Sequence, residues 1–148
     1  MLNFRYIKAD DKEFYMNSVK DFYNSEAALH SIPDENIEKT FDLAIAIKDS
    51  PFIELYIIEQ DGVRVGYALL LITYSQEAGG KAVWLDELYI LPKFQGQGIG
   101  GTFLEYLKSN YDVPRLRLEY APVNKFACEI YKKHGFKPLE YKQMIYGN

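Results

Sequence analysis

The sequence predicts a single α/β domain in which a mixed, mostly antiparallel sheet is flanked by helices. Segments with alternating apolar residues, typical of strands, are interspersed with segments of helical periodicity in the order β-α-α-β-β-β-α-β-α-β. With 148 residues, of which 48% are hydrophobic and 26% charged, the chain can form one hydrophobic core. No repeat, linker or low-complexity stretch interrupts residues 1–148, so we treat them as one domain.

The first part of the chain is predicted to form a strand, two helices and three antiparallel strands. Asp10 or Asp11 is expected to cap the first helix and Asp34 the second, because a carboxylate accepts hydrogen bonds from the free amides of a helix start. Turns at Gln60-Asp61-Gly62 and Ala78–Lys81 are typical of hairpins. The predicted elements are strand Leu2–Lys8, a helix to about Asn24, a helix whose apolar residues reach Ile47 and which Asp49-Ser50-Pro51 ends, and strands Phe52–Glu59, Val63–Tyr74 and Val83–Leu91.

The remaining chain is predicted to alternate two helices with two strands. The helix Ile99–Ser109 has an apolar face, and Asn110 is expected to cap its end. A helical crossover would make the next strand parallel to Val83–Leu91. The last three predicted elements are strand Arg115–Tyr120, a helix capped by Asn124 that runs to about His134 and is closed by Gly135, and strand Leu139–Tyr146.

The most informative segment is the loop that leads into the helix at Ile99. Gly96, Gly98, Gly100 and Gly101 are four glycines within six residues. Glycine lets backbone amides approach a ligand closely, and the first four amides of a helix have no intrahelical partner. The helix dipole adds partial positive charge at the same place. This loop is therefore predicted to bind an anion, and a diphosphate fits it best.

Other kinds of glycine-rich loop compete for this interpretation. Gly96-x-Gly98-x-x-Gly101, with Glu119 about 20 residues further on, satisfies the dinucleotide-binding fingerprint. Against it, Pro92–Gln95 separates the strand from the first glycine, and the pattern contains only one β-α-β unit. A Walker A loop is excluded because no Gly-Lys-Ser/Thr sequence follows the glycines. A glycine-rich helix start that binds no ligand is the structural alternative.

Two motifs together resemble the GNAT acetyltransferase superfamily. Gln95-Gly96-Gln97-Gly98-Ile99-Gly100 is similar to its (Arg/Gln)-x-x-Gly-x-(Gly/Ala) signature, although arginine is commoner at the first position. Asn124-x-x-Ala127-x-x-x-Tyr131-x-x-x-Gly135-Phe136 is similar to its second motif block, and the two blocks span residues 83–136. The resemblance implies an acyl-CoA N-acyltransferase fold, in which the fourth and fifth strands are parallel and splay apart.

The resemblance also implies acetyl-CoA as co-substrate. Its pantetheine arm would enter between the splayed strands, and its diphosphate would lie on the amides of the glycine loop. Asn124 would lie near the pantetheine in addition to capping its helix. The residues that the resemblance assigns to acetyl-CoA are Leu88, Tyr89, Ile90, Gln95, Gly96, Gln97, Gly98, Ile99, Gly100, Gly101, Thr102, Asn124, Ala127 and Tyr131.

Acetyl transfer to an amine requires a base and an acid. Deprotonating a lysine-like amine at pH 7 costs about 4 to 5 kcal/mol, because its pKa is about 10.4. The leaving thiolate needs a proton, and Tyr131 matches the tyrosine that serves this family as general acid. An amphipathic tyrosine packed in the core is the structural alternative for Tyr131.

Three carboxylates are candidates for the base. Alternation puts Glu87 on one strand face with Leu85 and Tyr89, and puts Asp86 on the opposite face, although a bulge would swap the faces. Glu119 ends the following strand, where other members of the family carry a catalytic glutamate. Two arginines share its predicted face and would pair with it in a purely structural role. A water relay to any of these carboxylates would serve as well.

Composition narrows the choice of partners and location. The net charge of −4 argues against nucleic acid, and no apolar run is long enough to span a membrane. A cytoplasmic location is expected because no signal-type segment begins the chain and Cys128 has no second cysteine to pair with. His30 and His134 lack metal-ligand spacing, so no metal is expected. A homodimer is an expectation from the family alone.

We therefore expect an acetyl-CoA-dependent N-acetyltransferase that acts directly on a primary amine of a small cationic molecule or of a protein. A cation would suit the acidic residues of the first two helices and their connection, namely Glu26, Asp34, Glu35 and Glu38. A non-catalytic acyl-CoA-binding module and, less well supported, a dinucleotide-binding domain are the alternative functions.

Overall fold

Five strands form one mixed sheet whose spatial order is their order in the chain. The structure is a computed structural model that describes residues 1–46 and 52–148. β1 to β4 pair antiparallel, whereas β5 joins β4 in parallel. The elements are β1 (Leu2–Tyr6), η1 (Ala9–Asp11), α1 (Lys12–Tyr23), α2 (Asp34–Ala46), β2 (Ile53–Gln60), β3 (Val63–Ser75), β4 (Gly80–Ile90), η2 (Pro92–Phe94), α3 (Ile99–Asn110), β5 (Arg115–Leu118) and α4 (Lys125–Lys133).

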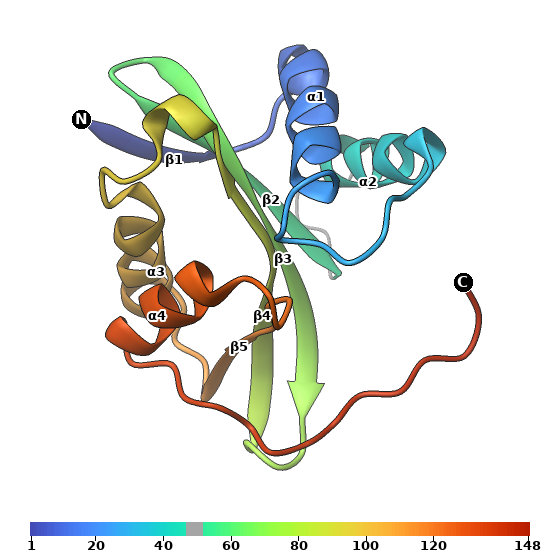
Figure 1. Cartoon of the computed structure of the whole chain (residues 1–148), viewed down its shortest axis with the longest axis vertical. Helices are drawn as coiled ribbons and strands as arrows, with labels where there is room; N and C mark the ends of the chain where they lie inside the picture. Colours follow the sequence, from blue (N-terminus) through green and yellow to red (C-terminus); the bar gives the residue numbers. More distant parts are fainter. Residues whose placement is uncertain (47–51) are drawn as a thin grey trace.

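The helices cover both faces of the sheet (Figure 1). α1 and α2 pack on one face around an apolar cluster that includes Tyr15 and Tyr67. α3 packs on the other face through Phe103 and Leu107, and α4 contributes Tyr131 to the same cluster. Burying each large apolar side chain of these two clusters contributes about 1.5–3 kcal/mol to folding.

The start of α1 is held by a buried ion-pair network. The carboxylate of Asp11 is fully buried and accepts two hydrogen bonds from the guanidinium of Arg5, at 2.8 and 3.0 Å. It also pairs with Arg64 on β3 at 2.7 Å and accepts the backbone amide of Lys8 at 2.8 Å. Asp11 precedes α1 as predicted, but its side chain makes no cap hydrogen bond to that helix. Its carboxylate instead fastens α1 to the sheet.

The parallel pairing of β4 and β5 is short. It runs from Ala82 opposite Arg115 to Leu85 opposite Leu118 and stops there. In the described part of the chain, no strand pairs with β4 on that side beyond Leu85. The predicted splay between the fourth and fifth strands is therefore confirmed, and it leaves one backbone edge of β4 open.

β4 contains a bulge at Asp86. Leu69 of β3 lies opposite Glu87, whereas the next residue, Leu70, lies opposite Leu85, so Asp86 is the extra residue. Consequently Leu85 faces the α3 cluster while the side chain of Glu87 bonds to residues of the α1 cluster. The expectation that Glu87 shares a face with Leu85 is wrong, because an extra residue reverses the alternation of a strand.

The predicted order of elements is confirmed from β1 through α4, with changes at several boundaries. α2 begins at Asp34 itself rather than after it. Asn110 is the last residue of α3, and Tyr111 takes the C-cap position that was expected for Asn110. β5 ends at Leu118, not at Tyr120. The expectations for Ile47 and for Asp49-Ser50-Pro51 fall outside the described residues.

The last predicted strand, Leu139–Tyr146, is absent. This segment leaves α4 and crosses the sheet end as an extended chain without ladder pairing (Figure 1). Tyr141 donates a hydrogen bond to Glu77 in the β3–β4 turn at 2.8 Å, and Gln143 donates to Glu119 at 2.6 Å. Apolar alternation alone does not make a strand, because the backbone also needs a partner edge that supplies ladder hydrogen bonds.

Candidate active site

The glycine loop between η2 and α3 has the backbone conformation that only glycine adopts readily. Gly96 and Gly98 both have φ of +77°, and Gly98 is the left-handed residue immediately before α3. The side-chain amide of Gln95 donates to the carbonyl of Ile90 at 2.8 Å, which ties the loop back to the end of β4. The loop therefore turns sharply from strand to helix beside the open edge of β4.

The first turn of α3 presents unpaired amides. The amides of Ile99, Gly100 and Gly101 lie in the first turn, where a helix supplies no carbonyl to accept them. No acidic residue lies in that turn to compete with an anion. Thr102 donates both its amide and its hydroxyl to the carbonyl of Gly98, each at 3.0 Å, so its hydroxyl can serve a ligand only as acceptor. This helix start fits a phosphate or diphosphate group.

The open edge of β4 lies next to the loop in sequence and space. Leu88, Tyr89 and Ile90 follow the point where β5 leaves β4, so backbone groups on that side can pair with an extended ligand. The carbonyl of Ile90 is already engaged by Gln95. The residues predicted to hold a pantetheine arm and a diphosphate are thus brought together by the structure.

α4 places Tyr131 on the wall of a cavity of about 610 Å³. β5, the C-terminal segment and Trp84 of β4 form the other walls. The Tyr131 ring contacts the rings of Tyr120 and Phe136, each with centroids 6.2 Å away. Burial raises the pKa of the Tyr131 phenol, so the phenol is protonated at neutral pH and can donate a proton or hydrogen bond.

At the start of α4, Asn124 has the capping role predicted for it. Its side-chain oxygen accepts the backbone amide of Ala127 at 3.2 Å. Cys128, one turn further on, donates its thiol to the Tyr120 hydroxyl at 3.1 Å. Ala127 is half-buried beside these residues. The second predicted motif block thus forms one short helix whose apolar side packs on the α3 cluster.

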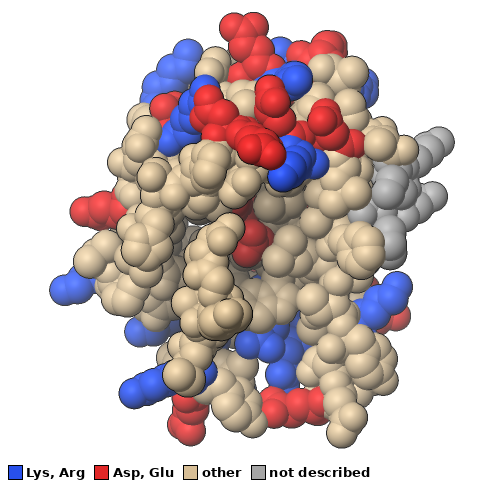
Figure 2. All heavy atoms as spheres, turned by 90° about the vertical axis from the view of Figure 1, so that its right-hand side faces the viewer, with Lys and Arg blue, Asp and Glu red and all other residues tan. Residues whose placement is uncertain are grey.

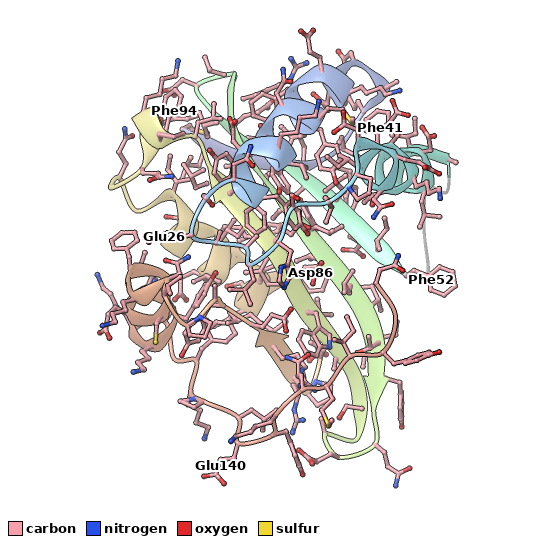
Figure 3. All side chains as sticks on the ribbon, turned by 45° about the vertical axis from the view of Figure 1, so that its right-hand side comes forward. Glu26, Phe41, Phe52, Asp86, Phe94 and Glu140 are labelled. Atoms are coloured by element: carbon pink, nitrogen blue, oxygen red, sulfur yellow. The ribbon has the colours of Figure 1, made fainter. Side chains whose placement is uncertain are left out.

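Asp86 lies at the centre of the hollowed face of the molecule. Figure 3 shows it between the α1–α2 connection that carries Glu26 and the C-terminal segment. Asp86 is half-buried; burial raises the pKa of its carboxyl group, and the negative charge of Glu119 raises it further. Glu119 is exposed and accepts the hydrogen bond from Gln143.

Glu87 occupies a different environment from its neighbour. It is only 7% exposed, and its carboxylate accepts hydrogen bonds from Tyr23 of α1 and Tyr67 of β3. Burial raises the pKa of Glu87, and these two hydrogen bonds act in the opposite direction. The two neighbouring acidic residues of β4 therefore lie in different environments. Asp86 lies beside the cleft, and Glu87 lies within the core under α1.

The acidic residues expected to attract a cation are mostly paired with lysines. Figure 2 shows acidic and basic atoms mixed over the upper part of the hollowed face. Glu26 is exposed on the α1–α2 connection at the edge of the hollow (Figure 3). The other three form ion pairs on α1 and α2, namely Asp34 with Lys20, Glu35 with Lys39 and Glu38 with Lys12.

Arg117 is a functional candidate that sequence reasoning had treated only as a partner of Glu119. Its guanidinium lies 4.0 Å above the ring of Trp84, and both residues line the cavity with Tyr131. Arg115 pairs instead with Glu77 at 3.1 Å. The alternation of β5 already placed both arginines on one face, but the stacking on Trp84 depends on the register between β4 and β5.

Metal sites and membrane-spanning helices are both absent from the described residues. Among residues 1–46 and 52–148, no three His, Cys, Asp or Glu side chains gather as a metal site would require. In the same part of the chain, no helix combines the length and apolarity needed to cross a membrane.

The sequence of this chain is similar to those of known proteins. A family model described as acetyltransferase (GNAT) domain matches residues 51–138. The mouse (Mus musculus) thialysine N-epsilon-acetyltransferase is 29% identical over 102 residues, which cover 62% of this chain and 59% of that protein. The spermine/spermidine N(1)-acetyltransferase of Bacillus subtilis is 30% identical over 83 residues, which cover 52% of this chain and 55% of that protein. The chain thus spans less than two thirds of the length of these relatives.

Solved structures extend the likeness to the whole fold. The aminoglycoside N-acetyltransferase AAC(6')-Iy in complex with CoA superposes with a TM-score of 0.76. The match covers 100% of this chain and 95% of that chain at 18% sequence identity. At this identity the likeness concerns the fold.

Proposed function

This chain belongs to the GNAT acetyltransferase family, and on that premise we propose that it transfers an acetyl group from acetyl-CoA directly to a primary amine. The two motifs that resemble the family lie in the glycine loop before α3 and in α4, within the residues that the family model matches. The observation that carries the proposal is the pairing of β4 with β5, which stops at Leu85 and leaves an open strand edge beside the start of α3.

Acetyl-CoA supplies the acetyl group and leaves as the thiol. We assign the diphosphate to the amides of Ile99, Gly100 and Gly101, and the pantetheine arm to the open edge of β4 at Leu88–Ile90. The left-handed conformation of Gly98 supports this assignment, because it turns the loop so that the first amides of α3 face outward together.

The bulge makes Asp86 our choice for the base. The amine nucleophile must lose a proton, and a half-buried carboxylate beside the cleft can accept it directly or through water. The raised pKa of Asp86 makes it a better proton acceptor than an ordinary exposed aspartate. Glu119 supports this role through its charge. Tyr131 then donates a proton to the departing sulfur and regains one from the nitrogen as the amide forms, and the proton on Asp86 passes to solvent.

The charges around the cleft suggest two acceptor classes. Asp86, Glu119 and Glu26 would hold an ammonium group, as a polyamine requires. Arg117, stacked on Trp84 in the cavity that Glu119 also lines, offers in addition a site for a carboxylate. This favours a small amine that also carries a carboxylate, such as an amino acid with a terminal side-chain amine. A polyamine or a protein amino group is the second candidate.

The proposal is tested by measuring thiol release from acetyl-CoA with a panel of amines. The panel contains thialysine, lysine, spermidine, an aminoglycoside and a peptide with a free amino terminus. We expect turnover with thialysine or lysine, and expect Arg117→Gln to raise their KM at least several-fold while spermidine turnover is unchanged. Turnover with spermidine and with no other amine of the panel would indicate that the acceptor is a polyamine. If no amine gives thiol release above the hydrolysis background, the proposal that the chain is an acetyltransferase is refuted.

Two alternative functions predict different ligand behaviour. A dinucleotide-binding domain would be stabilised against thermal unfolding by NAD, whereas we expect stabilisation by CoA and none by NAD. A non-catalytic acyl-CoA-binding module would be stabilised by acetyl-CoA but release no thiol with any amine. The two measurements together separate these alternatives from the proposed enzyme.

We further propose that two copies of the chain associate along the outer edge of β5. Within the described residues, no strand pairs with this edge, and the C-terminal segment exposes Tyr141, Met144, Ile145 and Tyr146. A second copy could cover both surfaces. Light scattering should give a dimer mass for the unaltered chain and a monomer mass for Ile145→Lys, and a monomer mass for the unaltered chain would contradict the proposal.

A further inference from the structure

The two oxygens of the Glu87 carboxylate are both engaged by residues of the fold. Oε2 accepts the hydroxyl of Tyr23 at 2.6 Å, and Oε1 accepts the hydroxyl of Tyr67 at 2.8 Å. The side chain is almost completely buried on the α1 side of β4. Such a satisfied carboxylate stabilises its neighbours, but it has poor access to the proton of an incoming amine.

The two tyrosines connect Glu87 to different parts of the molecule. Tyr67 belongs to β3 and lies opposite Tyr89 in the sheet, so its hydrogen bond joins two strands that are already paired. Tyr23 is the last residue of α1. Residues 24–33 follow it, and this connection carries Glu26 at the edge of the hollow that holds Asp86 (Figure 3).

Three tyrosines and one carboxylate surround Glu87. Tyr15 and Tyr23 of α1 and Tyr67 of β3 face it from the core, and Asp86 precedes it on β4. Burial raises the pKa of all three phenols, and the negative charge of Glu87 raises them further, so the two bonded hydroxyls remain donors. Among the described residues, no Lys or Arg perturbs Glu87; burial and the charge of Asp86 raise its pKa, and the hydrogen bonds from Tyr23 and Tyr67 lower it.

We propose that Glu87 is a positioning residue: through Tyr23 it fixes the end of α1 and thereby places the 24–33 connection that borders the amine site. This inference rests on the proposed acetyl transfer. The bulge at Asp86 separates the two carboxylates into two roles, with Asp86 beside the reacting groups and Glu87 holding the wall of the amine site. Glu87 acts on the amine through the connection and not by contact.

Two matched substitutions test the role of the Tyr23 bond. Tyr23→Phe and Tyr67→Phe each remove one hydroxyl donor to the same carboxylate. We expect Tyr23→Phe to raise the KM for the amine about tenfold, as loss of a hydrogen bond to a charged group does, with kcat and the KM for acetyl-CoA nearly unchanged. Tyr67→Phe should leave the KM for the amine unchanged. Equal effects of both substitutions on that KM would overturn the proposal.

Glu87→Gln separates positioning from base catalysis. If Glu87 positions Tyr23, the acid limb of the pH profile of kcat/KM persists in Glu87→Gln, and the main effect is a higher KM for the amine. Disappearance of the acid limb, with kcat reduced about 100-fold or more, would identify Glu87 as the base and overturn the proposal.

A measurement without substrate keeps this inference separate from the proposed function. Amide hydrogen exchange of residues 24–33 should be faster in Tyr23→Phe than in the unaltered chain, and unchanged in Tyr67→Phe. If the unaltered protein acetylates no amine, the proposed function fails while the exchange result still stands. Unchanged exchange in Tyr23→Phe would overturn the anchoring of the connection, whatever the activity.

Discussion

The imidazole of His134, at the end of α4, lies directly against the backbone of Gly101 in the first turn of α3. A Cβ atom at Gly101 would fall 2.5 Å from Nε2 of His134, far inside van der Waals contact. The other ring nitrogen, Nδ1, is 2.7 Å from the carboxylate of Glu105, also on α3. This close approach connects the glycine loop to α4, the two elements that carry the family motifs.

We expect Gly101→Ala to lower the free energy of unfolding by about 1–3 kcal/mol, because the imidazole must move to admit the methyl group. Gly100→Ala is the matched control, since its Cβ would lie 3.7 Å from Leu88 Cδ2, an ordinary contact. Urea denaturation should show a change within about 1 kcal/mol for the control. Adding His134→Ala should recover much of the loss, and its failure to do so would show that another contact is responsible.

Gly98→Ala should weaken acetyl-CoA binding beyond its effect on stability. An alanine at φ +77° costs about 1–2 kcal/mol in the left-handed region, even though nothing lies within 4 Å of the added Cβ. Gly62→Ala is a control with the same kind of strain, since Gly62 has φ +79° in the β2–β3 turn. Calorimetric titration with CoA should show weaker binding only for Gly98→Ala. Equal affinities in both variants would argue against the loop as the diphosphate site.

Asp86→Asn should lower kcat by about 10²–10⁴-fold and remove the acid limb of the pH profile. A base acts only when deprotonated, so a raised pKa moves this limb to higher pH. Because the charge of Glu119 contributes to that raised pKa, Glu119→Gln should shift the limb to lower pH and leave kcat at neutral pH much less affected. An unshifted limb in Glu119→Gln would show that the two carboxylates are not coupled as proposed.

Tyr131→Phe should reduce kcat about 10²-fold or more without weakening acetyl-CoA binding, because it removes a proton donor and keeps the ring. Tyr120→Phe is the matched control, since Tyr120 contacts the Tyr131 ring and bonds to Cys128. Single-turnover measurements would separate the chemical step from product release. Unaltered turnover in Tyr131→Phe would remove the residue from the proposed mechanism.

Asp11→Asn should destabilise the fold by about 1–3 kcal/mol, because it removes the charged acceptor shared by Arg5 and Arg64, while Glu59 still pairs with Arg5 at 2.8 Å. Burial alone would raise the pKa of Asp11, but its bonds to Arg5 and Lys8 and the nearby positive charges lower it below its ordinary value of 3.8. Its contribution to stability is therefore present above about pH 4 and is lost as the pH falls further.

The control for this prediction is Asp10→Asn, one residue earlier in the same turn. The Asp10 side chain is 77% exposed and lies 3.8 Å from Arg64. Its substitution should change the free energy of unfolding by no more than about 0.5 kcal/mol. In thermal denaturation, the stability difference between Asp11→Asn and the unaltered chain should be large at pH 7 and become smaller toward pH 3. Equal stability of the two proteins at pH 7 would contradict the prediction.

Features that depend on neighbouring residues could be read from the sequence. The conformation of the glycine loop and the cap at Asn124 arise from interactions within a few residues, and the structure confirms them. The helix start that we propose as the anion site follows from the same local rules, since unpaired amides and left-handed glycines need no distant contact.

The different environments of Asp86 and Glu87 were decided by the tertiary structure. One extra residue opposite β3 reverses the faces of β4, and the pattern of apolar residues around Asp86 is compatible with either register. The strand predicted at Leu139–Tyr146 is absent for a related reason. Alternating apolar residues do not specify which strand edge, if any, is available for pairing. By itself the sequence determined the order of the elements from β1 to α4, because that order follows from local residue patterns. Strand register, and with it the environment of each carboxylate, depends on hydrogen bonds between distant segments and was decided only when the sheet was assembled.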